Sequence, residues 1–312
     1  MNVLSLFDGI GGAMLALEDA GIKVDNYFSS EVDKHCLAVS NKQFPNIIQV
    51  GDVKNIDGNN FPKIDLLIGG SPCQDLSGAF KGKGLEGNRS SLFFEFKRIK
   101  ESIKPSFFLL ENVKNKWKET IDDYIGEEGI IINSHFFTAQ SRPRCYWTNI
   151  PIDIPNKISD DKIIDIMQKD NVDRKYFFDN KLLNGFDSSS INTSKVGINK
   201  IFDIPRELLK DNERQRRVYS PYGKSPTLLA RSDTTKILYN NNLRKLTPLE
   251  CERLQGIKDN FTSILSDTQR YKAVGNGFTV PVISSILKNM GKIKKQPIFV
   301  DAEIFDTIED LF

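Results

Sequence analysis

The stretch Leu66-Leu67-Ile68-Gly69-Gly70-Ser71-Pro72-Cys73 is an apolar run that stops at two glycines and then presents a cysteine directly after a proline. An apolar run followed by glycines is typical of a buried parallel strand that delivers a reactive side chain at its carboxyl end. The proline fixes its own φ and stiffens the backbone that aims the thiol. The pattern makes Cys73 a candidate nucleophile, although a free cysteine is often only a small buried hydrophobe.

Strand and helix signals alternate on both sides of this stretch. They predict strands at 3–7, 26–30, 47–50, 65–68 and 107–110, and helices at 13–20, 34–43, 91–102 and 281–288. This alternation predicts an α/β fold, in which a doubly wound, Rossmann-like sheet carries helices on both faces. Polar residues sit just past the strand ends, at the edge where such sheets bind ligands. These residues are Asp8, Glu31, Asp52, Cys73 and Glu111.

The composition is ordinary for a soluble globular protein. The chain has 312 residues, of which 39% are hydrophobic and 27% charged, and this length suffices for one large core and a smaller lobe. No apolar run approaches the roughly 20 residues of a membrane helix, and the first residues predict a strand, not a signal peptide. Four scattered cysteines without a CxxC pair argue against zinc and disulfides and favour a reducing compartment.

The segment from Ile204 to Lys245 is locally basic. It contains ten basic residues, four acidic residues and three tyrosines, whereas the whole chain has a net charge of only +2. Basic and aromatic residues together indicate a nucleic-acid contact surface, with a solvated basic face as the alternative. The stretch before it, from about 155 to 200, is rich in Asn, Asp, Lys and Ser and lacks sustained apolar periodicity, which predicts loops.

The first predicted strand runs into Phe7-Asp8-Gly9-Ile10-Gly11-Gly12. Glycines at this point allow a tight turn and the close approach of a ligand. Glu31 follows about 20 residues later, a spacing at which an acid hydrogen-bonds the ribose hydroxyls of a nucleoside. These features predict a nucleoside-containing cofactor, with a glycine-rich structural turn as the alternative.

The order of these and further motifs resembles the DNA (cytosine-5)-methyltransferase family over nearly the whole chain. The further motifs are Gly51-Asp52, Pro72-Cys73, Glu111-Asn112-Val113, Gln140-Ser141-Arg142-Pro143-Arg144 and Gly275-Asn276-Gly277. The stretch from Ser71 to Val113 looks most similar to the de novo methyltransferase branch of animals. The compact chain, without a further regulatory domain, is more similar to a bacterial or phage enzyme.

The resemblance implies the fold of a class I S-adenosylmethionine-dependent methyltransferase, with a doubly wound, mixed sheet. Residues 1–160 and 265–312 would form the catalytic, cofactor-binding domain, and residues 161–264 an inserted target-recognition domain. The resemblance also implies S-adenosyl-L-methionine as cofactor, double-stranded DNA as partner and no metal. We expect a monomeric, cytoplasmic protein that is not bound to a membrane.

The resemblance also assigns the catalytic groups. Cys73 would add to C6 of a cytosine flipped out of the duplex, and Glu111 would hold or protonate N3 as the adduct forms. Arg144 would hold the cytosine O2, and Arg142 a flanking phosphate. The alternatives are a structural salt bridge for Glu111 and a surface charge pair for the two arginines.

The family's remaining contacts fall on a larger set of positions. Cofactor contacts are expected from Phe7, Asp8, Gly9, Gly11, Glu31, Val32, Asp52, Val53, Leu92 and Asn276. DNA contacts are expected from Ser77, Arg89, Gln140 and Arg231. Residues 78–90 are predicted to form a loop that closes on the DNA, and Thr227-Leu228 matches a pair typical of the recognition domain. The chain departs from the family at Gly277-Phe278, where serine and valine are usual.

Other functions stay open at this point. A catalytically silent DNA-binding homologue is disfavoured by the intact Cys73, Glu111, Arg142 and Arg144. One branch of the family modifies a tRNA cytosine with the same motifs, but the sizeable basic region of this chain favours DNA. A dehydrogenase would suit the glycines and the acid, yet it has no use for a Pro-Cys nucleophile. The target sequence is not readable here, because readout depends on which side chains meet which base edges.

Overall fold

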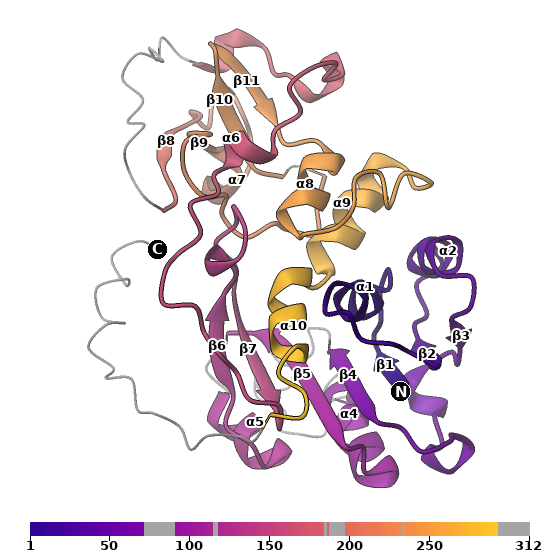
Figure 1. Cartoon of the computed structure of the whole chain (residues 1–312). Coiled ribbons are helices and arrows are strands. Elements are labelled where there is room, and N and C mark those ends of the chain that lie inside the picture. Colours follow the sequence, from indigo (N-terminus) through magenta and orange to yellow (C-terminus); the bar gives the residue numbers. More distant parts are fainter. Residues whose placement is uncertain (72–90, 115–117, 184–185, 187–196, 233, 293–312) are drawn as a thin grey trace.

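The structure is a computed structural model that describes residues 1–71, 91–114, 118–183, 186, 197–232 and 234–292 (Figure 1). The larger of two sheets has seven strands in the order β3-β2-β1-β4-β5-β7-β6. Their bounds are β1 Asn2–Leu6, β2 Asn26–Ser30, β3 Ile48–Gln49, β4 Leu66–Gly70, β5 Phe107–Val113, β6 Ile130–Asn133 and β7 Pro143–Thr148. The five strands predicted from the sequence are all present.

The central strand β1 pairs in parallel with β2 on one side and with β4 on the other, and β4 pairs in parallel with β5. Leu4 and Leu6 of β1 are fully buried, because a central parallel strand is covered on both faces. Strand β7 then runs antiparallel to both β5 and β6. The sheet is therefore mixed and doubly wound, which confirms the predicted fold class.

Helices cover both faces of this sheet. The α-helices are α1 Gly12–Asp19, α2 Lys34–Gln43, α4 Ser91–Ile103, α5 Lys118–Ile125, α6 Ile163–Ile166, α7 Glu213–Arg216, α8 Pro248–Leu254, α9 Asp267–Asn276 and α10 Val280–Leu287. Short 3₁₀ helices are η1 Val53–Asn55, η2 Gly58–Asn60, η4 Ser134–Phe136, η5 Arg174–Tyr176 and η6 Asn180–Leu183.

Val3 packs into one core with α1 and α10, whereas Leu4 packs into another with α4 and α5 (Figure 1).

The smaller sheet has four strands in the order β11-β10-β9-β8. Their bounds are β8 Lys200–Asp203, β9 Arg217–Tyr219, β10 Lys236–Tyr239 and β11 Asn242–Lys245. A small core that includes Ile204, Val218 and Leu238 fills this part of the molecule. The sheet lies inside the predicted recognition domain, but the division into 1–160 with 265–312 and 161–264 stays a prediction.

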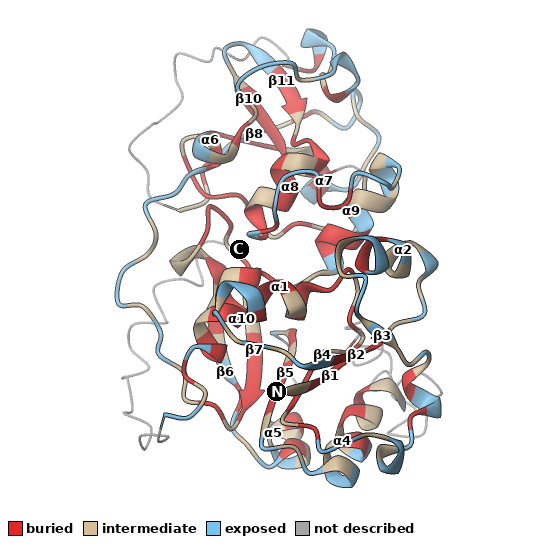
Figure 2. Ribbon diagram, turned by 45° about the vertical axis from the view of Figure 1, so that its right-hand side comes forward, coloured by how far each residue is buried: buried red, intermediate tan, exposed pale blue. Residues whose placement is uncertain are grey.

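A buried ion pair joins the smaller sheet to α8. Both terminal nitrogens of Arg244 on β11 donate to the Glu250 carboxylate, at 2.7 Å each, and Glu250 is fully buried. Thr247 caps the helix, and its backbone N–H donates to Glu250 in return. Figure 2 shows α8 largely buried, as is β7 in the larger sheet. The ion pair and the cap thus make this segment part of the scaffold.

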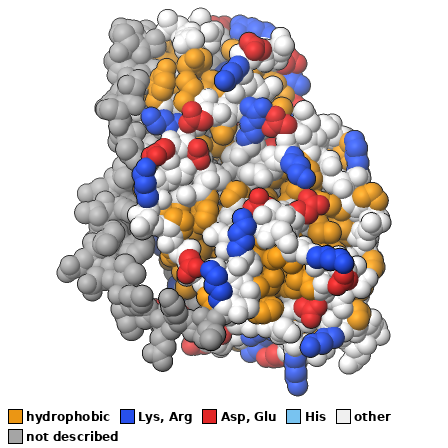
Figure 3. Space-filling model, in the orientation of Figure 1, with side chains coloured by type: hydrophobic (Ala, Val, Ile, Leu, Met, Phe, Trp, Pro, Cys, Tyr) orange, Lys and Arg blue, Asp and Glu red, His pale blue; other side chains and the backbone are white. Residues whose placement is uncertain are grey.

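The basic segment is only partly a surface. Lys224, Lys236 and Arg244 are buried, and the ammonium group of Lys236 donates to the Gln215 backbone oxygen at 2.6 Å. On the face of the molecule shown in Figure 3, basic and acidic side chains are interspersed. A count of basic residues therefore overstates the positive charge available to DNA. In the part of the chain that the structure describes, no helix is both long and apolar enough to cross a bilayer.

Candidate active site

The carboxyl ends of four parallel strands bring distant residues to one edge of the larger sheet. Phe7 follows β1, Glu31 follows β2, Ser71 follows β4, and Glu111 lies near the end of β5. The register pairs Gly70 with Glu111 directly. This common edge is where doubly wound sheets bind ligands, and Glu31 and Glu111 of the predicted set lie along it.

The glycine turn after β1 leaves free space beside Gly9. Gly9 and Gly11 adopt left-handed conformations, with φ of 61° and 84°. A side chain at Gly9 would meet nothing within 4 Å, whereas one at Gly11 would press on the Phe44 ring at 2.9 Å. The backbone N–H of Gly9 donates to Glu31 at 2.8 Å. The turn is thus tied to the acid predicted to bind ribose.

Glu31 is held by backbone donors beside an exposed apolar side chain. The Glu31 carboxylate also accepts from the N–H groups of Val32 and Asp33, at 2.7 Å each, which fixes its orientation. The Val32 side chain is 68% exposed, unusual for a large apolar residue, and offers a face to a planar ring. Asp52 accepts from the Lys54 N–H at 3.0 Å and caps η1, while Val53 beside it is buried.

Asp8 faces the interior of the sheet. Its carboxylate accepts hydrogen bonds from the hydroxyls of Ser5 and Tyr27, at 2.6 Å each, and from Ser29 at 2.8 Å. Burial raises its pKa to about 6, against the opposing effect of the three hydroxyls. The carboxylate therefore ties the glycine turn to β1 and β2, and it is too buried to offer a surface to a cofactor.

Leu92 and Asn276 lie on elements that approach the edge from opposite faces. Leu92 is half-buried on α4 and packs against the core on that face of the sheet. Asn276 is exposed at the end of α9. Phe278 is buried, and its ring would touch side chains added at Gly12, at 3.5 Å, and at Gly70, at 2.8 Å. The bulky departure from the family thus fills space between α1 and β4.

The catalytic edge is built around the end of β4. The side-chain amide of Asn112 donates to the backbone oxygen of Ser71 at 3.1 Å and to its hydroxyl at 2.8 Å. This contact anchors the chain two residues before Cys73. Sequence reasoning did not single out Ser71 and Asn112 as a pair, because nothing in the pattern shows that a serine contacts an amide 41 residues away. Cys73, Ser77 and Arg89 lie outside the described residues, as does the loop predicted at 78–90.

Glu111 and Arg144 form an ion pair at this edge. The Arg144 Nε lies 3.0 Å from Glu111 Oε1, and the two side chains are only 13% and 15% exposed. Burial raises the pKa of Glu111, and the positive charges of Arg144 and Arg142 oppose that rise. A buried carboxyl group with a raised pKa, fixed by a cation that cannot deprotonate, is suited to general acid catalysis.

The Arg142 side chain is more deeply buried than a residue that contacts phosphate would be. It is 3% exposed, and its guanidinium donates to the backbone oxygens of Leu228 at 3.1 Å, Gly275 at 2.8 Å and Gly277 at 3.1 Å. These bonds join the recognition segment to the end of α9. A direct phosphate contact does not fit this burial, so the structure gives Arg142 a positioning role.

Gln140 is also a scaffold residue. Its side chain is fully buried, donates to the Gln255 side chain at 3.0 Å and accepts from the Leu228 N–H at 2.9 Å. A direct DNA contact does not fit this burial, whereas the bonds to Gln255 and Leu228 fit a residue that orders the loop. Arg231 is exposed in the described recognition segment, and its contact with DNA stays a prediction.

The chain is similar to a known protein family over most of its length. Residues 1–292 match the family model described as C-5 cytosine-specific DNA methylase. The chain is 32% identical to the type II methyltransferase M1.ScrFI of Lactococcus lactis subsp. cremoris, over 93% of this chain and 77% of the relative. It is also 32% identical to the type II methyltransferase M.SsoII of Shigella sonnei, over 93% and 79%.

Solved structures share the fold. The methyltransferase EhMeth of Entamoeba histolytica superposes with a TM-score of 0.68 at 18% identity, over 93% of this chain and 97% of that one. The Dnmt2 methyltransferase of S. pombe superposes with a TM-score of 0.66 at 16% identity, over 92% and 97%. At these identities the likeness concerns the fold alone.

Proposed function

Because this chain belongs to the C-5 cytosine-specific DNA methylases, which transfer the methyl group of S-adenosyl-L-methionine to cytosine C5 in DNA, we propose that Cys73, Glu111 and Arg144 carry out that reaction here. The observation that supports this assignment best is the buried Glu111–Arg144 pair beside the end of β4, two strands' width from the glycine turn. The nucleophile follows that strand end within three residues.

Cytosine C5 is a weak nucleophile until a group adds to C6. The Cys73 thiolate forms a bond to C6, which moves the electrons of the C5–C6 double bond toward C5. Bound S-adenosyl-L-methionine would supply the electrophilic methyl group to C5, with S-adenosyl-L-homocysteine as the leaving group. Loss of the C5 proton, to water or another base, returns the electron pair, breaks the bond between sulfur and C6 and releases the product.

Glu111 stabilises the adduct while it forms. Its raised pKa keeps a proton available at pH values where an ordinary glutamate has lost it, and this proton is donated to cytosine N3 and returned to Glu111 when the C5–C6 double bond re-forms. Arg144 fixes the orientation of the Glu111 carboxyl through its Nε, which leaves a terminal nitrogen to hold the cytosine O2. Arg142 and Gln140 hold the segment that carries Arg144 through bonds in the interior, and they touch neither base nor phosphate.

The cofactor residues fit a nucleoside carrying a sulfonium side chain. Glu31 would bind the ribose hydroxyls, and the exposed Val32 would cover one face of the adenine. Asp52 would accept from the adenine amino group, and Gly9 leaves room for the methionine part. Phe7, Gly11, Val53, Leu92 and Asn276 complete the set, in which Asn276 approaches from the end of α9.

The setting of the reaction is also part of the proposal. We propose that the substrate is double-stranded DNA, bound between the catalytic domain and the recognition domain as divided above, with Ser77, Arg89 and Arg231 among its contacts. The relatives named above are type II methyltransferases, which supports a modification role in a bacterial or phage-infected cytoplasm. We propose a monomer, since one chain supplies every motif of the site.

Base-resolution methylation sequencing of DNA from a methylation-free bacterial host tests this function. Expression of the protein should place 5-methylcytosine in one short sequence context, and Cys73→Ala should abolish it. Cys36→Ala is the matched control, because this free thiol lies on α2 and has no role in the mechanism. Unmethylated DNA from the wild-type culture, together with 5-methylcytosine in tRNA, would contradict the proposal.

A further inference from the structure

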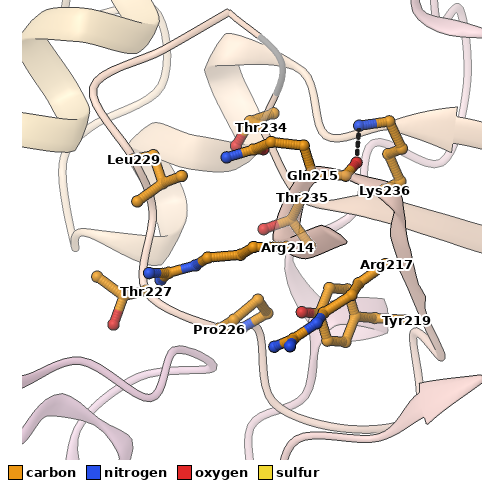
Figure 4. A pocket seen from close by; sticks show the side chains of 10 residues that line it. All are labelled: Arg214, Gln215, Arg217, Tyr219, Pro226, Thr227, Leu229, Thr234, Thr235 and Lys236. Carbon is orange, nitrogen blue, oxygen red and sulfur yellow. Dashed lines mark hydrogen bonds between the residues drawn. The ribbon is translucent and has the colours of Figure 1, made fainter. Parts of the chain in front are cut away.

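An ion pair joins two distant parts of the chain that both contribute to the proposed cofactor site. Lys272 on α9 places its Nζ 2.8 Å from Oδ2 of Asp33, the N-cap of α2, although the two residues are 239 positions apart. Many other ion pairs are local. Arg217, which lines a pocket in the smaller sheet (Figure 4), pairs with Glu213 four residues away. A pair between distant segments restrains their relative position, which a local pair cannot do.

We propose that Lys272 and Asp33 form a clasp on the cofactor site, which holds the end of α9 against the loop after β2 and slows the release of the cofactor. This role rests on the proposed function, in which Glu31 and Asn276 contact S-adenosyl-L-methionine. Lys272 and Asp33 are then positioning residues, which act through Glu31 and Asn276 without touching the cofactor themselves.

Asp33 is coupled directly to Glu31. The backbone N–H of Asp33 donates to Glu31 Oε1 at 2.7 Å. Its Oδ1 accepts from the His35 N–H at 2.9 Å, which caps α2, and its Oδ2 accepts from Lys272. A single residue thus caps a helix, holds Lys272 and orients the acid proposed to bind ribose. A shift of Asp33 would therefore turn the Glu31 carboxylate.

Lys272 is coupled to Asn276 through the helix that carries both. The two residues lie four positions apart on α9, and so they share one face of it. The buried Arg142 side chain fixes the same helix toward the interior, because it donates to the Gly275 backbone oxygen at 2.8 Å. The ion pair adds an attachment of α9 to α2, so the position of Asn276 depends on both contacts.

Both members of the clasp stay charged near neutral pH. The hydrogen bond from Lys272 lowers the pKa of Asp33 below its usual range, and the same bond raises the pKa of Lys272. The side chains of Lys272 and Asp33 are 49% and 28% exposed. Ion pairs at such positions are weak and are screened by salt, so we expect a modest effect that fades at high ionic strength.

Binding of S-adenosyl-L-homocysteine at low salt, measured by calorimetry and by stopped-flow displacement, tests the clasp. Lys272→Met should weaken binding about three- to fivefold, chiefly through faster release, whereas Lys272→Arg should keep most of the affinity. Asp33→Asn should weaken binding to a similar extent, because asparagine still caps α2 but carries no charge. The double variant should bind as each single variant does, since either change alone removes the ion pair.

Lys258→Met is the matched control. Lys258 forms an ion pair with Glu18, at 3.4 Å and 240 positions apart, but neither residue adjoins one assigned to the cofactor. This variant should bind S-adenosyl-L-homocysteine as the wild type does. In methylation assays, Lys272→Met should raise KM for S-adenosyl-L-methionine, while KM for DNA and the single-turnover rate at saturating cofactor stay unchanged.

Two outcomes would overturn the clasp and leave the methyltransferase function in place. One is unchanged affinity and release in Lys272→Met, even if its urea midpoint falls, since that pattern marks an ion pair that only supports the fold. The other is a double variant whose loss of affinity is the sum of the two single losses. A wild-type protein that binds no S-adenosyl-L-homocysteine would instead overturn the proposed function itself, so the two failures are distinguishable.

Discussion

The Nε of Arg144, on β7, lies 3.0 Å from Oε1 of Glu111, on the neighbouring strand β5. The two strands are antiparallel, and Arg144 pairs with Val113, two residues along from Glu111. Alternate residues of a strand point to the same face, so this register places both side chains on one face of the sheet. The pair therefore results from the strand order, in which β7 lies next to β5.

Glu111→Gln should lower the rate of methyl transfer by about 10²- to 10⁴-fold, because the amide cannot donate a carboxylic proton to N3. Single-turnover methylation of a duplex checks this, and equilibrium binding of DNA should change little. In the wild type, the rate should decline as pH rises past the raised pKa of Glu111, since only the protonated group donates. Glu119→Gln, on the exposed start of α5, is the matched control. A full rate for Glu111→Gln would exclude the acid role.

Arg142→Ala should lower the free energy of unfolding by about 3 kcal/mol, because it removes a donor from the backbone oxygens of Leu228 and Gly275 in a buried site, whereas Gly277 keeps the Gln255 amide as donor. Urea denaturation measures this loss. The salt dependence of DNA binding should stay the same, since the side chain is buried and its guanidinium is bonded to backbone oxygens. Arg231→Ala offers the contrast, with a slope reduced by about 1 if that exposed arginine does contact phosphate. A reduced slope for Arg142→Ala would contradict its positioning role.

Gly70 and Phe278 should be energetically coupled. A methyl group at Gly70 would lie 2.8 Å from the Phe278 ring and 3.1 Å from Glu111 Oε2. Gly70→Ala should therefore destabilise the protein, and Phe278→Val in the same chain should recover part of the loss, with a coupling of about 1–3 kcal/mol. Denaturation of the four proteins of the double-mutant cycle gives this number. Strict additivity would show that the ring does not restrict the end of β4.

Asp8 should make stability depend on pH. Its pKa is about 6 in the folded protein and near 3.8 when unfolded, so the folded state holds the proton more tightly. The contribution of Asp8 to the free energy of unfolding should be fully present below its unfolded pKa. This contribution, about 3 kcal/mol, should be lost as the pH rises through about 6. Thermal or urea unfolding of wild type beside Asp8→Asn isolates the effect as a difference between the two proteins. Tyr27→Phe removes a donor to the carboxylate and should move the window to higher pH. A difference that does not vary with pH would contradict the buried, protonated carboxyl group.

The sequence by itself determined the larger part of the fold. Short apolar runs ending at glycine or at a polar residue fix parallel strands, and the carboxyl ends of such strands share one edge. The grouping of Phe7, Glu31 and Glu111 at that edge follows from this rule without any knowledge of side-chain contacts. The same local reasoning located α2 at its observed bounds and α4 to within one residue at its end. Strands β6 and β7 were not predicted; β7 begins at a proline inside the arginine motif, whose polar residues precede its apolar part.

Only the tertiary structure decided what the polar residues of the site do. The motif Gln140 to Arg144 offers Gln140, Arg142 and Arg144 as candidate site residues, yet the first two are buried as scaffold and Arg144 meets Glu111. Their fates depend on segments more than 80 residues away, such as Leu228, whose approach no local pattern encodes. In the same way Asp8 turned inward because hydroxyls from β1 and β2 converge there. Periodicity reports which face of an element is buried, whereas the partner of a buried polar group is set by the packing of distant elements.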